Sequence, residues 1–170
     1  MRLFLQNLLL WALPFASLRA QVPSNYWQQR VEYQIDIRLD DLSHAVQGRA
    51  KIKYFNHSPD TLKRVFFHLY WNAIQPNSAY AQWAKRTKDV MTSDRLFALK
   101  PTEIGRMDIF TVQQNGVAID YRVNETVMEA TLSRPLNPGD FDVIEVAWQG
   151  QVPLCIRRGG RNNSAGVAYT

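Results

Sequence analysis

The sequence contains few of the residues that cross-link a chain or interrupt its regular structure. Cys155 is the only cysteine among 170 residues, which excludes an intramolecular disulfide framework. Glycine and proline number only eight each, which excludes collagen-like and linker-like chains. The net charge is a mild +5 with scattered cations, so a nucleic-acid-binding surface is not supported. With 46% hydrophobic and 21% charged residues, the composition is that of one ordinary globular domain.

The chain also lacks a compact catalytic or metal-binding motif. No His-Glu-x-x-His, Cys-x-x-Cys, Gly-x-Ser-x-Gly or phosphate-loop pattern occurs. His44, His57 and His68 have no partner at the i, i+4 spacing that places two imidazoles on one helical face. We expect the first two to be solvated in turns and His68 to be a hydrogen-bonded strand residue. We therefore assign no catalytic, cofactor-binding or metal-binding residue within this chain.

Two other reactive groups have simpler structural interpretations. Cys155 lies between Leu154 and Ile156 and is expected to be a small buried hydrophobe rather than a nucleophile. Asp140 and Asp142 share one face of a predicted strand, which would allow an acid–base pair. The turn that precedes them favours ordinary turn chemistry instead, as it does for Asp40 and Asp41.

Residues 1–20 have the order of a secretory signal peptide. Arg2 gives a positive start, residues 3–13 are almost entirely apolar, and small residues precede the expected cleavage after Ala20. The apolar run is shorter than the roughly 20 residues that cross a bilayer, so no stable membrane anchor is expected. A buried N-terminal helix is the alternative, but the run has no polar face. The sequence thus predicts export to the periplasm or the exterior, and a mature chain of residues 21–170.

The mature chain shows a hydrophobic period of two. Residues 31–39 alternate apolar and polar side chains, which predicts a strand with one apolar face. A polar turn follows, and residues 46–55 are predicted to form the returning strand. Residues 65–71 form a continuous apolar run, which predicts a strand covered on both faces. An aromatic binding platform is the alternative interpretation of this run.

Strand character returns in the second half of the chain. Asn115-Gly116 separates strand-like residues 107–111 from an alternating segment at 117–123, which predicts a type I′ hairpin. Residues 128–132 and 141–148 add further strands. About seven strands and little helix predict a mainly all-β fold, an antiparallel sandwich or saddle-like curved sheet.

One segment departs from this pattern. Residues 79–99 contain good helix formers and predict a short helical excursion. Its cations, Lys85, Arg86 and Lys88, are expected to form a solvated face, because no glycine-rich loop or aromatic ladder accompanies them.

The C-terminal segment carries a cluster of arginines. Arg157, Arg158 and Arg161 would be able to hold a carboxylate or phosphate, but a solvated or domain-facing loop is the simpler interpretation. Residues 166–170 resemble the start of a strand with no visible pairing partner. We therefore expect a truncated chain or an isolated first module.

Several segments, taken in order and spacing, resemble a known family. They are Tyr26-Trp27-Gln28-Gln29 before the first strand, Ser58-Pro59-Asp60-Thr61-Leu62 leading into Val65-Phe66-Phe67-His68-Leu69-Tyr70, Asn72-Ala73, Pro101-Thr102-Glu103-Ile104-Gly105, Asn137-Pro138-Gly139, and Gly150-Gln151-Val152-Pro153 before Arg157-Arg158. The pattern resembles the N-terminal β domain of bacterial zinc metallopeptidases of the aminopeptidase N (gluzincin) family. The resemblance covers the whole of residues 21–170.

The resemblance implies a saddle-like β domain that packs against a separate catalytic domain. In that family the catalytic domain carries His-Glu-x-x-His with a distant Glu, the zinc ion, and a Gly-x-Met-x-Asn loop that grips substrate. This chain contains neither motif, so no zinc ligand, catalytic Glu or substrate-binding residue is transferred to it. The implied role is a non-catalytic module that shapes the substrate cleft of a catalytic domain, in cis or on an adjacent chain, and that meets peptide substrate only through that domain.

A different class of protein is also consistent with these residues. A free-standing periplasmic β-sandwich would be able to bind a peptide or glycan through Trp71, Tyr80 and Trp83. The two hypotheses differ in what the coding sequence contains beyond Thr170: a His-Glu-x-x-His motif supports the first hypothesis, and a stop codon beside an unrelated gene supports the second.

Overall fold

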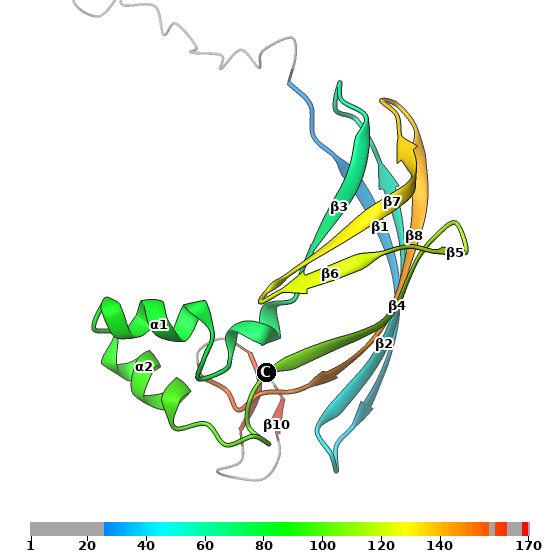
Figure 1. Ribbon diagram of the computed structural model, residues 1–170. Helices are drawn as coiled ribbons and strands as arrows, with labels where there is room; N and C mark the ends of the chain where they lie inside the picture. Colours follow the sequence, from blue (N-terminus) through cyan, green and yellow to red (C-terminus); the bar gives the residue numbers. More distant parts are fainter. Residues whose placement is uncertain (1–25, 157–158, 163–167, 170) are drawn as a thin grey trace, which may run out of the picture.

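The computed structural model describes residues 26–156, 159–162 and 168–169. They form two main antiparallel β-sheets that pack face to face, with two short helices beside one end, and a separate two-stranded pair (Figure 1). The expected signal peptide at 1–20 and two of the clustered arginines, Arg157 and Arg158, lie outside the described residues. No helix in the described part of the chain is long and apolar enough to span a bilayer.

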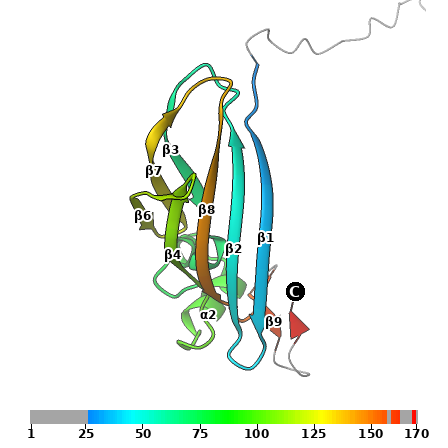
Figure 2. The same ribbon diagram turned by 90° about the vertical axis from the view of Figure 1, so that its right-hand side faces the viewer.

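The larger sheet has five strands and is curved along its length (Figures 1 and 2). Its three longest strands run in continuous register over 11 residues, which fixes one alternating set of side chains on each face. From one edge to the other the strands are β1 (Arg30–Asp40), β2 (Ala45–Phe55), β8 (Phe141–Gln151), β4 (Arg106–Gln114) and β5 (Val117–Ala118).

The smaller sheet has three strands, in the order β3 (Leu62–His68), β7 (Val127–Leu136) and β6 (Tyr121–Asn124). Glu129 on the central strand β7 is bound from both sides, by Arg64 Nη1 of β3 at 2.9 Å and by Arg122 Nη2 of β6 at 2.6 Å. Hydrogen bonds from Arg122 and Arg64 lower the pKa of the Glu129 carboxyl below its ordinary value. This carboxylate therefore links all three strands.

The core lies between the two sheets. Each sheet contributes alternate residues to it, which is why the apolar positions in the sequence recur with a period of two. Its buried members are Ile52, Val112, Ile144 and Val146 from the larger sheet, Val65, Met128, Ala130, Leu132 and Leu136 from the smaller sheet, and Leu69 and Ile119 from connecting segments. The mainly all-β sandwich predicted from the sequence is confirmed.

The helical excursion predicted at 79–99 is also confirmed. A short 3-10 helix, η2 (Tyr70–Ala73), precedes α1 (Ala79–Arg86) and α2 (Val90–Phe97). Ser78 begins α1, because its Oγ accepts a hydrogen bond from the Ala81 backbone N–H at 3.1 Å. The helices enclose a second small core, made of Ala81, Leu96, Leu99 and Ile156.

The apolar run at 65–71 differs from the prediction of a strand covered on both faces. The strand ends at His68, and η2 follows it. Within β3, Val65 is buried but Phe66 is 61% exposed. The reason is that β3 is an edge strand of a sheet with only one covered face, so its second row of side chains points to solvent.

The structure tests the predictions made for the Asn115-Gly116 hairpin and for the C-terminal segment. Asn115 and Gly116 both have positive φ, 50° and 81°, and join Gln114 to Val117 as the predicted hairpin requires. The segment after it is not one strand, because β5 joins the larger sheet and β6 the smaller. The expectation that the C-terminal strand lacks a partner is wrong: β10 (Ala168–Tyr169) pairs with β9 (Arg161–Asn162).

Candidate functional site

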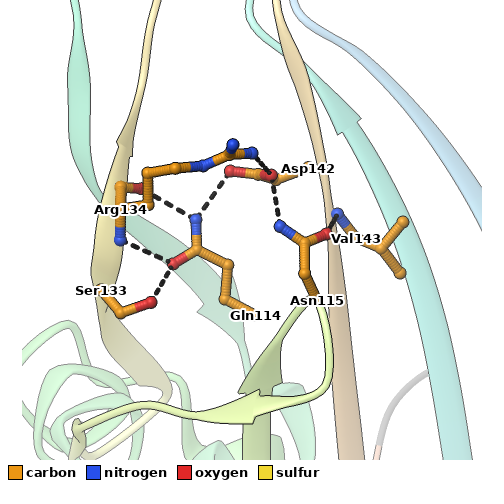
Figure 3. A network of polar contacts seen from close by, with 6 residues as sticks. All are labelled: Gln114, Asn115, Ser133, Arg134, Asp142 and Val143. Atoms are coloured by element: carbon orange, nitrogen blue, oxygen red, sulfur yellow. Dashed lines mark hydrogen bonds and ion pairs between the residues drawn. The ribbon is translucent and has the colours of Figure 1, made fainter.

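Asp142 on β8 is the most enclosed acidic side chain in the described part of the chain, with 1% of its surface exposed. Its carboxylate accepts hydrogen bonds from Gln114 Nε2, Asn115 Nδ2 and Arg134 Nη2, each at 2.6 Å (Figure 3). Gln114 and Asn115 lie at the end of β4, and Arg134 lies on β7. The carboxylate therefore ties the larger sheet to the smaller one.

The amide groups around Asp142 have further partners. Gln114 Oε1 accepts from Ser133 Oγ at 2.9 Å and from the Arg134 backbone N–H at 3.1 Å. Gln114 Nε2 also donates to the Arg134 carbonyl at 2.8 Å. Asn115 Oδ1 accepts from the Val143 backbone N–H at 3.1 Å. The network is thus fully hydrogen-bonded, as a rigid structural connection requires.

The electrostatics of Asp142 disfavour a role in proton transfer. Burial raises the pKa of this carboxyl, but hydrogen bonds from Asn115, Gln114 and Arg134 stabilise the charged form and bring the pKa below its ordinary value. A general acid near neutral pH needs the opposite shift. Asp140 is exposed and is not a partner of the Asp142 carboxylate, so the structure does not join the two residues into a catalytic pair.

The three histidines lie in separate parts of the fold. His44 is in the turn between β1 and β2, and His57 Nδ1 lies 2.9 Å from the Gln28 carbonyl. His68 ends β3 and is exposed, with its ring stacked on Tyr70 at a centroid distance of 5.2 Å. Within residues 26–156, 159–162 and 168–169, no group of three or more His, Cys, Asp or Glu side chains is placed to hold a metal ion.

The arginine cluster is represented among the described residues by Arg161, which is neither solvated nor open to an anion. Its side chain is 3% exposed, and its guanidinium donates to the carbonyls of Thr102 at 2.7 Å and Val152 at 3.3 Å. Cys155 is half-buried rather than buried, and its backbone N–H donates to the Arg161 carbonyl at 2.9 Å. These hydrogen bonds hold the chain segment that follows β8 in place.

The proposed aromatic trio is divided by the fold. Tyr80 and Trp83 stack on α1 with ring centroids 6.1 Å apart, and Trp83 is 46% exposed. Trp71 instead lies against the backbone of β8, where a Cβ on Gly150 would come within 2.7 Å of its indole. Its indole therefore secures η2 to the larger sheet, and of the three proposed residues only Tyr80 and Trp83 lie together.

The polar face of the larger sheet holds an open depression of about 580 Å³. Charges of both signs alternate along it, which is typical of a solvated sheet face rather than a reactive centre. Its lining includes Asp36, Arg49, Lys51 and Glu145, together with Phe110.

The opposite, apolar face of the same sheet extends onto β1, where no described residue covers it fully. Tyr33, Ile35, Ile37 and Leu39 share this face, since Tyr33 lies directly opposite the core residue Ile52. Their exposed fractions are 61%, 50%, 61% and 45%. We call these four side chains the β1 apolar row. A contiguous exposed apolar surface of this kind marks an interaction site.

The described residues thus form a two-sheet β fold with an exposed β1 apolar row. Among them we find no catalytic pair and no group of metal ligands. Solved structures that contain a part with this fold include M1 zinc metallopeptidases. A mutant of the enzyme from Deinococcus radiodurans bound to the substrate Tyr-Ser-Ala aligns with a TM-score of 0.50 and 17% sequence identity, over 81% of this chain and 25% of that chain. A two-domain M1 zinc metallopeptidase mutant bound to L-arginine aligns with the same TM-score, identity and coverage.

These structures establish the fold of this chain, which spans about a quarter of the length of the enzymes it matches. No family model matches the sequence. No curated protein matches it either. The likeness confirms the mainly β fold that the sequence resemblance implied.

Proposed function

We propose that this chain is the non-catalytic N-terminal β module of an exported zinc aminopeptidase-like metallopeptidase. The observation that carries the proposal is the shared fold: 81% of this chain aligns with one quarter of a much longer zinc peptidase. The remaining three quarters of such an enzyme leaves ample chain for a catalytic domain, in cis or on an adjacent chain.

The β1 apolar row supports this proposal, because it offers a surface for the missing domain. Four large apolar side chains with 45% to 61% exposure are unfavourable in water and are stabilised when a neighbouring domain covers them. In this role the module closes one side of the substrate cleft. A cleft closed at one end admits only a chain terminus, which is the basis of exopeptidase selectivity.

The side chains of the described residues do not fit a zinc ion. His44, His57 and His68 lie in three separate parts of the fold, and no cluster of potential ligands occurs in that part of the chain. The buried carboxylate of Asp142 is already bound by three donors. Zinc therefore belongs to the catalytic domain in this proposal, and residues 1–20 serve as the export signal.

The proposal predicts that the purified chain hydrolyses no aminoacyl amide and retains no stoichiometric zinc. Hydrolysis of a chromogenic aminoacyl amide, measured with and without added zinc, and metal analysis after dialysis check this. A matched control is the Asp142→Asn variant, which should likewise neither hydrolyse the substrate nor retain zinc, because Asp142 has a structural role. Zinc-dependent hydrolysis by the original chain would refute the proposal.

A second candidate function is a free-standing β-sandwich that binds a peptide or glycan. The stacked pair of Tyr80 and Trp83 favours it, since an exposed aromatic face is able to stack on a sugar or a peptide side chain. This function requires no catalytic domain in the same or an adjacent reading frame.

A further inference from the structure

β1 presents an open edge of the larger sheet. Over its 11 residues it pairs with β2 on one side, and no described segment pairs with its other side. Figure 2 shows β1 along the outer border of the sheet. The strand contains no proline and no bulge, two of the devices by which proteins prevent an edge from pairing, although it does carry charged side chains. Its outward backbone groups therefore form a regular template for another strand.

The side chains of β1 are self-complementary about Ile35. We propose that two copies of this chain pair antiparallel through β1, with a two-fold axis at Ile35, so that the larger sheets join into one continuous sheet. Residues equidistant from Ile35 then face each other across the interface. On the polar face, Glu32 meets Arg38 of the second copy, and Arg30 meets Asp40 of the second copy. The symmetry repeats both contacts, which gives four opposite-charge pairs.

The apolar face is matched in the same register. Tyr33 meets Ile37 of the second copy, Val31 meets Leu39 of the second copy, and Ile35 meets its own counterpart. The two β1 apolar rows thereby become one stripe, in which each exposed side chain gains an apolar neighbour across the strand pair. Backbone hydrogen bonds add about one bond per residue along the paired strands.

Neighbouring registers are disfavoured by charge. With the axis at Gln34, Arg30 faces Arg38 and Glu32 faces Asp36. An axis at Asp36 places Asp36 opposite its own counterpart and Glu32 opposite Asp40. An axis between two residues would set polar side chains against apolar ones, because directly opposed residues share one face.

The outward edge is distinct from the apolar face that the proposed catalytic domain covers. Edge pairing uses the outward backbone groups and the side-chain contacts across the two β1 strands, and it needs no catalytic domain, so it does not depend on the proposed function. If the dimer is disproved, the proposed function is therefore unaffected, and the reverse also holds.

Charge reversal tests the interface. Sedimentation velocity of the purified chain should show a monomer–dimer equilibrium. Glu32→Arg and Arg38→Glu should each raise the dissociation constant about tenfold or more, because each places like charges opposite each other twice. Mixed in equal amounts, the two variants should associate with each other, since unlike charges then face across the interface. Circular dichroism melting confirms that each variant is folded.

A cross-link tests the register. In a Cys155→Ala background, Ile35→Cys should form a disulfide dimer under mild oxidation, because the two-fold axis brings the two positions together. The matched control, Ile37→Cys, should not, because its counterpart lies several residues away along the strand. A chain that stays monomeric overturns the proposal, as does a dimer unaffected by both charge reversals. A monomer whose β1 amides are protected from hydrogen exchange also overturns it, because the same chain then covers this edge.

Discussion

Replacing Asp142 by alanine should lower the free energy of unfolding by about 2–3 kcal/mol, because the change leaves one N–H of the buried Gln114 amide without its acceptor. Gln114 Nε2, which is 2% exposed as a residue, loses its charged partner, and the link from β8 to Arg134 on β7 is removed. Arg134 itself is 71% exposed and is readily solvated, so its loss adds little. Urea unfolding followed by circular dichroism measures the difference.

The pH dependence of this effect has a definite sign. The folded-state pKa of Asp142 lies below its ordinary value, so its contribution to stability is present above the unfolded pKa of about 3.9 and is lost as the pH falls through the folded pKa. The stability difference between the original chain and Asp142→Asn should therefore shrink below about pH 4. The control is Asp140→Asn, an exposed neighbour that should change stability by less than about 0.5 kcal/mol. Equal effects of the two asparagine variants would show that the network does not hold the sheets together.

Ile144→Ala should destabilise the fold by about 3–4 kcal/mol, because a fully buried isoleucine in the middle of the core leaves a cavity when truncated. Ile144 is 0% exposed. The matched control is Ile37→Ala on the same apolar face of the same sheet, where the side chain is 61% exposed. That change should cost less than about 1 kcal/mol in the free energy of unfolding.

Comparing Ile144→Ala with Ile37→Ala tests which part of the larger sheet's apolar face is covered by the smaller sheet. A large loss at Ile144 and a small loss at Ile37 are expected if the smaller sheet covers the middle of the larger sheet and leaves β1 open. Similar losses at both positions would mean that the β1 apolar row is already buried within this chain. The β1 apolar row would then not be available to a catalytic domain.

Local patterns predicted most of the fold. Alternation over 31–39 was sufficient for β1, because a polar side chain at every second position leaves one possible face for the apolar side chains. Asn115-Gly116 predicted its hairpin because both residues tolerate positive φ. The helical excursion followed from the helix propensity of residues 79–99, and the structure adds that Ser78 caps α1.

The sequence was a poor guide to which faces are covered. A continuous apolar run such as 65–71 is compatible with a buried strand or with an edge strand, and only the tertiary neighbours decide between them. Phe66 is exposed because no second layer lies over that side of β3. Likewise, 117–123 is divided between two sheets because β5 pairs with β4 of the larger sheet and β6 pairs with β7 of the smaller sheet.

The hydrogen-bond network around Asp142 also could not be predicted from the sequence. Its partners Gln114 and Asn115 are 28 and 27 residues away, and only the fold brings them to the carboxylate. One signal was present: Asp142 is in phase with Ile144 and Val146, so an acidic residue occupies the apolar face of a strand. For Arg161 no such signal exists, because its partners are backbone carbonyls.

Sequencing the DNA that follows the codon for Thr170 would reveal most directly whether a peptidase domain accompanies this β module. The account predicts that the same reading frame, or an adjacent one, encodes His-Glu-x-x-His with a further Glu downstream. A stop codon directly after Thr170, beside a gene without that motif, would contradict it and favour the free-standing binding module.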